Sequence, residues 1–130
     1  MTTPQSQITT FLKSQAFGVV GASNDRSKFG NRVLRHYLER HLKVYPINPN
    51  ESQVEGLACL SSVNELPDEV ISLSIITPPA VTEEIVEAAI AKGIKNIWMQ
   101  PGAQSAKAIA VCEKAGVNVI GDGRCVLVEV

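Results

Sequence analysis

The sequence predicts an α/β fold, a three-layer sandwich in which helices cover both faces of a mostly parallel β-sheet. Short apolar runs of strand length alternate with longer segments whose apolar residues recur at helical spacing. The 130 residues are 45% hydrophobic and 19% charged, which suits a single packed core. We expect residues 1–130 to form one domain, with residues 1–14 as an N-terminal helix or extension.

Five apolar runs, each followed by turn-forming residues, have the length and composition of buried strands. They cover residues 17–21, 42–47, 70–76, 94–99 and 117–120. Residues 56–60 are expected to add a short, edge-like strand, and the apolar residues 126–130 close the chain. Strands that alternate with helices of this length form parallel βαβ units, so the predicted domain is Rossmann-like.

Four segments have helical spacing of their apolar residues, and a fifth is long enough for one helical turn. The helices are expected at residues 8–14, 29–38, 79–92 and 105–114, and the single turn within residues 60–66. Ser27 is the expected N-cap of the second helix. In the third helix, Pro79 suits the first turn and Gly93 is the expected C′ residue.

Composition argues against several classes of protein. Twelve Lys and Arg balance 13 Asp and Glu without a long run of one sign, so no basic stripe indicates nucleic-acid binding. No apolar run approaches the roughly 20 residues that span a bilayer, and residues 1–14 lack the apolar core of a signal peptide. Cys59, Cys112 and Cys125 form neither a disulfide framework nor a zinc-ligand pattern. We therefore expect a cytoplasmic protein that binds no metal, membrane or nucleic acid.

Turn-forming residues follow each predicted strand, at the edge where parallel α/β sheets bind their ligands. These segments are rich in Gly, Pro, Ser and Asn, which let backbone amides come close to a ligand without bulky side chains in the way. They are residues 21–24, 48–50, 77–79, 100–102 and 121–125.

The turn after the first strand has the features of a phosphate site. Gly21 allows a tight turn and a close backbone approach, while Ser23 and Asn24 add side-chain donors. Positive charge would come from Arg26, Lys28 and Arg32. The alternative is that Gly21 only makes a turn and that the basic side chains are solvated, because one glycine-rich turn is a weak signal.

The end of the second strand argues against NAD. The spacing G-x-G-x-x-G is absent, and Asn48 stands where an NAD site has Asp or Glu for the ribose 2′-hydroxyl. A neutral, rigid turn suits a ligand whose ribose carries a phosphate. This favours CoA, or NADP, over NAD.

Five segments in order resemble a known family. They are VVGASNDRSKFGNRV (19–33), VYPINPN (44–50), TPP (77–79), IVEAAIAKGIKNIWMQPGA (85–103) and AGVNVIGDGRC (115–125). Together they are similar to the CoA-binding domain family, which includes small stand-alone proteins and the N-terminal domain of the succinyl-CoA synthetase α subunit. The resemblance covers about residues 17–128 and implies that CoA or an acyl-CoA lies across the strand ends.

The residues that the resemblance places at the CoA lie in the loops after the strands. The first loop would face the phosphates or ribose through Gly21, Ala22, Ser23 and Asn24. The second would lie by the adenine or ribose-phosphate end through Asn48, Pro49 and Asn50. The later loops would pack on the ligand and line the pantetheine path through Thr77, Pro78, Gln100, Pro101 and Gly102. Charge and reach, rather than the resemblance, add Arg26 and Lys28.

No set of residues forms a catalytic constellation. The synthetases carry a further domain with a phosphorylated histidine, whereas His36 and His41 lie on or just after the predicted helix 29–38, away from the strand ends. We therefore expect a protein that is not an enzyme and that binds CoA as a carrier, a sensor or a partner module, as a homodimer or with another protein. The alternatives are a small NAD(P)-binding oxidoreductase or redox sensor, and an interaction protein that has lost its ligand.

Cys125 has two interpretations. Arg124 beside it would favour the thiolate, which is the reactive form, and stand-alone members of the family that the chain resembles have a cysteine at this place. One hypothesis is that Cys125 forms a mixed disulfide with the CoA thiol. The other is that it is a buried structural cysteine.

Overall fold

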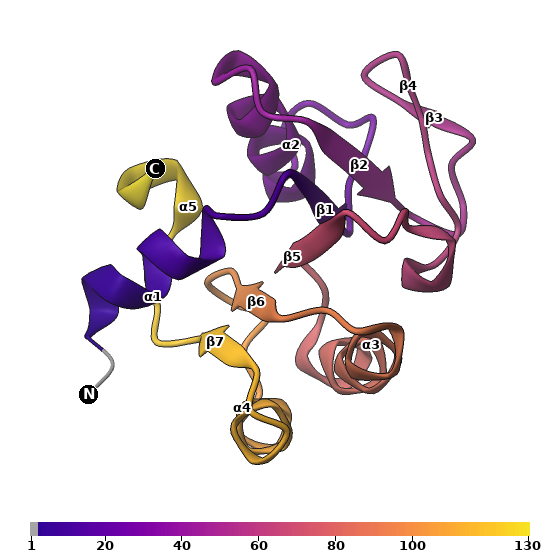
Figure 1. Cartoon of the computed structure of the whole chain (residues 1–130). Helices are drawn as coiled ribbons and strands as arrows, with labels where there is room; N and C mark the ends of the chain where they lie inside the picture. Colours follow the sequence, from indigo (N-terminus) through magenta and orange to yellow (C-terminus); the bar gives the residue numbers. More distant parts are fainter. Residues whose placement is uncertain (1–2) are drawn as a thin grey trace.

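The computed structural model describes residues 3–130, whose five longer strands form one parallel sheet in the order β2-β1-β5-β6-β7 (Figure 1). The strands are β1 (Ala16–Val20), β2 (Val44–Ile47), β5 (Val70–Ile75), β6 (Asn96–Met99) and β7 (Asn118–Ile120). Every pairing between them is parallel. The predicted Rossmann-like α/β class is confirmed.

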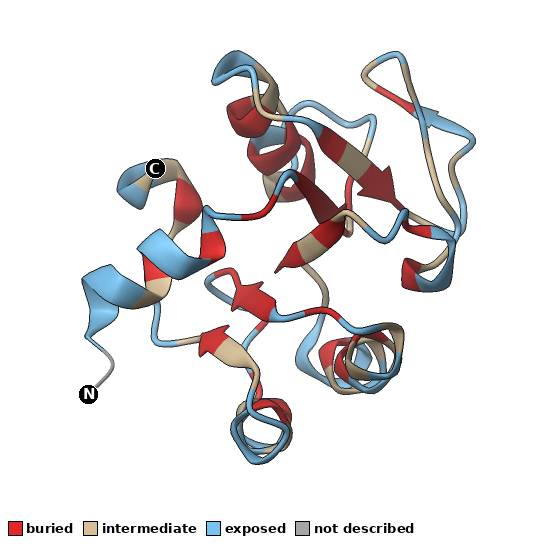
Figure 2. Ribbon diagram, viewed as in Figure 1, coloured by how far each residue is buried: buried red, intermediate tan, exposed pale blue. Residues whose placement is uncertain are grey.

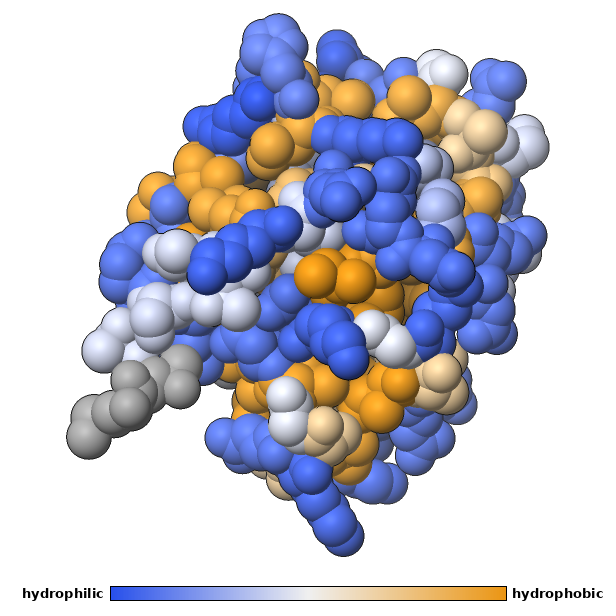
Figure 3. All heavy atoms as spheres, in the orientation of Figure 1, coloured by the Kyte–Doolittle hydropathy of each residue, from blue (hydrophilic) through white to orange (hydrophobic). Residues whose placement is uncertain are grey.

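Helices cover both faces of the sheet (Figure 1). They are α1 (Pro4–Phe11), α2 (Phe29–Glu39), α3 (Pro79–Lys92), α4 (Ala106–Lys114) and α5 (Val126–Glu129), with the 3-10 turn η1 (Val63–Glu65). One apolar cluster lies between the sheet and α3 and α4, and the other between the sheet and α1, α2 and α5. Buried residues accordingly follow the strands and the inner faces of the helices in Figure 2. Polar side chains cover much of the face drawn in Figure 3, with apolar residues showing between them.

The cap geometry confirms both predicted ends of α3 and corrects the starts of α1 and α2. Gly93 ends α3 in the left-handed region at φ 100°, and Pro79 opens that helix. The prediction of Ser27 as an N-cap is wrong, because Lys28 holds that position with an extended backbone and no side-chain hydrogen bond. The first helix lies earlier than predicted, since the Thr3 side chain caps it by accepting from the N–H of Ser6.

Two short segments have structures that the sequence left open or indicated differently. Residues 56–60 add no full strand to the main sheet: β3 (Gln53–Val54) and β4 (Leu57–Ala58) form a separate antiparallel hairpin, and only Leu60 makes a single parallel bridge, to Ile47 at the edge strand β2. Glu55 and Gly56 turn this hairpin with positive φ values of 51° and 78°, which suits a two-residue turn. Residues 126–129 form the short helix α5, whose Val126 is fully buried.

The strand order reverses beside β1. The chain passes from β1 through α2 to β2 on one side, and then returns to β5 on the other side of β1. Loops leaving β1 and β5 in opposite directions leave a crevice at the carboxyl ends of these strands. None of the helices among residues 3–130 is both long and apolar enough to span a membrane.

The buried thiol of Cys112 should make stability depend on pH. Burial, with a smaller contribution from Glu113, raises the pKa of this thiol from 9.0 to about 11. The unfolded chain loses the proton more easily, so the stabilisation is complete below about pH 9 and is lost as the pH rises to about 11. Burial also raises the pKa values of Tyr37 and Cys59, which therefore lose stabilisation in the same range. We expect urea unfolding to show a decrease over this interval that is about 2–3 kcal/mol larger in the wild type than in Cys112→Ala, and equal pH slopes for the two proteins would contradict this.

Candidate functional site

A cavity of about 380 Å³, called the main cavity below, lies at the carboxyl ends of β1, β2 and β5, where the strand order reverses. The η1 turn and one side of α3 complete its wall. Its lining side chains are apolar, hydroxyl or amide groups. They come from Val20, Gly21, Ile47, Asn48, Pro49, Ser61, Ser62, Val63, Asn64, Ile76, Thr77, Pro78, Val81, Ile85 and Ala88.

A second hollow, of about 350 Å³, adjoins the first across the loop after β5. The two share Ile76, Thr77 and Pro78, and the second continues over the start of α2 to the loop after β6. Its other lining residues are Phe29, Pro101, Gly102 and Ala103. An elongated ligand can therefore lie across the Thr77–Pro78 turn with one part in each hollow.

Glycine is required at the turn between β1 and α2. Gly21 has φ 93°, and a Cβ atom there would lie 1.9 Å from the carbonyl oxygen of Ile76. Its N–H donates to the carbonyl of Ile47 at 3.0 Å, which joins the turn to β2. Gly30, in the first turn of α2, is a second required glycine that the sequence did not indicate. A Cβ there would lie 2.0 Å from the carbonyl oxygen of Gly21, so α2 packs directly on the turn.

Three consecutive backbone N–H groups follow Gly21 without a partner. Within the described residues, the N–H groups of Ala22, Ser23 and Asn24 donate no hydrogen bond. The first turn of α2, which starts at Phe29, adds N–H groups that have no partner within the helix. Ala22 is fully buried, whereas Ser23 is half-buried and Asn24 is exposed, so the amides of Ser23 and Asn24 beside the helix N-terminus are the ones that suit a phosphate.

The predicted side-chain donors of this loop bind other parts of the protein. Ser23 Oγ accepts from the N–H of Asp25 at 3.1 Å. Asn24 Nδ2 donates to the carbonyl of Gln53 at 2.7 Å and to Glu51 at 2.8 Å, which fastens the loop to the β3–β4 hairpin. What this loop leaves free for a ligand is therefore its backbone.

Of the three predicted cations, Arg32 lines a separate hollow with Arg35 and His36, and the other two differ in their surroundings. Arg26 pairs with Glu55 at 3.2 Å while two thirds of its own side chain is exposed. Asn31 first, and then Arg26, lower the pKa of the Glu55 carboxyl through hydrogen bonds. Lys28 is exposed at the start of α2 and forms no ion pair within residues 3–130.

At the end of β2, the structure separates three neighbouring predicted residues. Asn48 and Pro49 line the main cavity, whereas the exposed Asn50 does not. Asn48 Nδ2 donates to the carbonyl of Ala22 at 2.8 Å, and its Oδ1 accepts from the N–H of Asn50 at 2.9 Å. The Asn48 carboxamide thus joins two loops.

Of the later loops, Thr77 and Pro78 line both hollows, and Pro101 and Gly102 line the second. Gln100 is fully buried instead. Its Nε2 donates to Ser74 Oγ at 3.3 Å, and its Oε1 accepts from the N–H of Val126, so the side chain anchors α5.

Cys125 stands at the N-cap of α5, half-buried, and lines neither hollow. The Arg124 guanidinium is engaged elsewhere. It pairs with Asp122 at 2.9 Å and donates to the carbonyl of Pro4 and to Gln7 Oε1. Arg124 therefore holds α1 and lowers the pKa of the Asp122 carboxyl by hydrogen bonding. A CoA mixed disulfide at Cys125 stays a prediction.

The sequence did not predict that α3 and η1 would contribute residues to the wall of the main cavity. Val81 and Ile85 face the main cavity beside Pro78, together with Ser62 and Asn64 of the η1 segment. The helical spacing of the apolar residues in α3 could have indicated these wall residues. The core takes only part of that face, since Val86 is fully buried while Val81 is 38% exposed.

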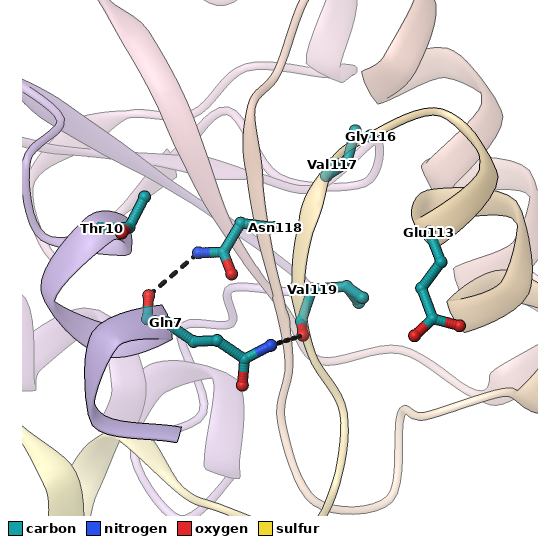
Figure 4. Close-up of a pocket in the computed structure, with 7 residues that line it drawn as sticks. All are labelled: Gln7, Thr10, Glu113, Gly116, Val117, Asn118 and Val119. Carbon is teal, nitrogen blue, oxygen red and sulfur yellow. Dashed lines mark hydrogen bonds between the residues drawn. The ribbon is translucent and has the colours of Figure 1, made fainter. Parts of the chain in front are cut away.

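A third hollow, of about 440 Å³, lies at the outer edge of the sheet between α1, α4 and β7 (Figure 4). Gln7 spans it by donating to the carbonyl of Val119 at 3.0 Å, while Asn118 donates to the carbonyl of Gln7. These bonds attach α1 to the edge strand β7. The hollow shares no lining residue with the two at the strand ends.

A model of the CoA binding domain family matches residues 15–130. The chain belongs to the CoA binding domain family. Among solved structures, this CoA binding domain resembles a conserved hypothetical protein from Pyrococcus furiosus, with 40% identity and a TM-score of 0.85. That match covers 89% of this chain and 99% of the other.

Longer proteins contain a similar region. The ADP-forming acetate–CoA ligase II subunit alpha of Pyrococcus furiosus is 30% identical over 122 residues, which cover 85% of this chain and 27% of the subunit. The dinucleotide-forming acetyl-coenzyme A synthetase 1 of Ca. Korarchaeum cryptofilum, solved with phosphate and ADP, is 29% identical with a TM-score of 0.72. The match covers 82% of this chain and 25% of the synthetase chain. The chain thus spans under a third of the length of these ligase relatives.

Proposed function

We propose that this CoA binding domain binds CoA or an acyl-CoA across the carboxyl ends of β1, β2 and β5, as a non-catalytic carrier, sensor or partner module. The observation that carries the proposal is the 380 Å³ cavity beside the Gly21 turn, at the point where the strand order reverses. Open α/β sheets bind ligands at this position. Family membership favours CoA over other nucleotides.

The Gly21 turn suits the pyrophosphate of CoA. Its free N–H groups at Ser23 and Asn24 can donate to phosphate oxygens, and the N-terminus of α2 adds a favourable dipole. Lys28 is exposed beside that terminus and can add charge. Arg26, already paired with Glu55, contributes less net charge.

The cavity walls suit the less polar parts of the ligand. Pro49, Pro78, Val81 and Ile85 present apolar surface from three different elements. These rigid and branched side chains make a slot for a flat ring such as adenine. The second hollow, past Pro101 and Gly102, can take the pantetheine arm.

The lining of both hollows favours binding over catalysis. Among the described residues, no Asp, Glu, His, Lys, Arg, Cys or Tyr side chain lines either hollow. General acid–base catalysis works through such a group within hydrogen-bond reach of the reacting atoms. If the chain contributes to acyl transfer, as the names of the ligase relatives suggest, a protein partner would supply the chemistry.

Titration calorimetry with CoA, acetyl-CoA, NAD and NADP tests the proposed ligand. We expect CoA to bind at least about tenfold more tightly than NAD, because the neutral Asn48 stands where NAD needs a carboxylate acceptor. Acetyl-CoA should bind comparably to CoA, since the nucleotide part is shared. A preference for NAD or NADP would support the oxidoreductase alternative and contradict the proposal.

A further inference from the structure

Two asparagine side chains hold consecutive carbonyl groups of the loop after β1. Asn48, at the end of β2, donates from Nδ2 to the carbonyl oxygen of Ala22 at 2.8 Å. Asn31, in the first turn of α2, donates from Nδ2 to the carbonyl oxygen of Ser23 at 2.8 Å. The loop is therefore held from both elements that flank it in the fold.

These bonds determine where the next N–H groups point. All peptide bonds of the described residues are trans, and the C=O and N–H of a trans peptide point in opposite directions. Holding the Ala22 carbonyl directs the N–H of Ser23 away from Asn48. Holding the Ser23 carbonyl directs the N–H of Asn24 away from Asn31. Both N–H groups are among those without a partner in residues 3–130.

Neither carboxamide can turn over without losing a second bond. Asn31 is fully buried; its Oδ1 accepts from Arg35 Nε at 2.7 Å, and its Nδ2 also donates to Glu55 at 3.0 Å. Asn48 Oδ1 accepts from the N–H of Asn50. Because Arg35 Nε and a backbone N–H only donate, each Oδ1 is assigned and each Nδ2 must face its carbonyl.

We infer that Asn31 and Asn48 are positioning residues, which hold the N–H groups of Ser23 and Asn24 toward the pyrophosphate of bound CoA. This inference rests on the proposed function, since it needs an anionic ligand at the Gly21 turn. Donors that are fixed before binding cost little reorganisation when the ligand arrives. Asn31 then acts on CoA affinity from a fully buried position, through the loop and without touching the ligand.

Amide NMR of the ¹⁵N-labelled full chain tests the direction of the two N–H groups. We expect the amide signals of Ser23 and Asn24 to move downfield on addition of CoA or ADP, because each N–H would donate to a phosphate oxygen. Adenosine, which has no phosphate, should leave both signals in place. Saturating CoA binding with both signals unmoved would overturn the inference but not the proposed function, whereas absence of CoA binding would overturn both.

Uncharged substitutions test the two side chains without adding repulsion to the phosphates. Asn31→Leu and Asn48→Leu keep a similar volume and remove the bonds to the loop. The matched control is Asn96→Leu: Asn96 is also buried and also uses both ends of its carboxamide, but with Ser72 and Asn118 at the amino ends of the strands.

We expect CoA affinity to fall about tenfold or more in each loop variant and to stay at the wild-type value in Asn96→Leu. Thermal unfolding of all three separates lost stability from lost binding. If Asn31→Leu does not fold, Asn48→Leu carries the test through NMR, because Asn48 also lines the main cavity: its Ser23 amide signal should no longer move downfield on addition of CoA. Folded loop variants that bind CoA as tightly as the control would overturn the inference. Equal losses in all three variants would also overturn it.

Discussion

Gly21→Ala is expected to lower the free energy of unfolding by about 2–5 kcal/mol. An alanine at φ 93° costs about 1–2 kcal/mol in backbone strain. Its Cβ would also lie 1.9 Å from the carbonyl oxygen of Ile76, and overpacking against backbone adds about 1–3 kcal/mol. Ile76 cannot move away freely, because its N–H bonds to the carbonyl of Val20 at 2.8 Å. Urea unfolding followed by circular dichroism measures the loss.

Gly93→Ala is the matched control for this experiment. Gly93 ends α3 at φ 100°, close to the value at Gly21, but a Cβ there has nothing within 4 Å. The control therefore retains the backbone strain without the clash and should cost about 1–2 kcal/mol. Equal losses in the two variants would mean that the close approach of Gly21 to Ile76 does not constrain the turn.

The Gly21 turn also shows what a sequence can predict about such a site. A strand pattern that ends in glycine is a local feature, so the turn was predicted from neighbouring residues. Gly30 carries no local signal, because a glycine in the first turn of a helix resembles any other helical residue. Its role comes from α2 packing on the carbonyl of Gly21, which is a property of the folded chain.

The sequence does not show which residues, far apart along the chain, have side chains that bind each other. Asn24 and Arg26 have residue types that suit a phosphate, yet both bind residues of the β3–β4 hairpin region. Gln100 follows a strand as predicted, but its side chain turns into the core. In each case the residue lies at the predicted edge of the sheet, and a partner far along the chain decides where the side chain points.

The cavity wall on α3 shows the same limit for apolar residues. Helical periodicity predicted one apolar face, and Val86 lies in the core as expected. Periodicity does not tell how much of that face the sheet covers. The uncovered part, with Val81 and Ile85, becomes the wall of the cavity. This surplus of apolar surface next to a turn with free amides is what distinguishes a binding site from an ordinary loop cluster.

Val81→Asp should weaken CoA binding at least about a hundredfold while the domain stays folded. The carboxylate would face the apolar wall and the bound ligand without a partner, and an unpaired charge removed from water costs several kcal/mol. The fold should tolerate the change, since Val81 is 38% exposed and an acidic residue in the first turn of α3 suits the helix dipole. Titration calorimetry with CoA measures the loss.

Val128→Asp makes the same substitution on α5, where Val128 is 79% exposed and lines neither strand-end hollow. It adds the same charge to the protein, so any general repulsion of the anionic ligand is shared by the two variants. The additional loss in Val81→Asp then measures contact with the cavity wall. If both variants bind CoA like the wild type, the ligand does not occupy the main cavity, and the proposed binding mode across β1, β2 and β5 is wrong.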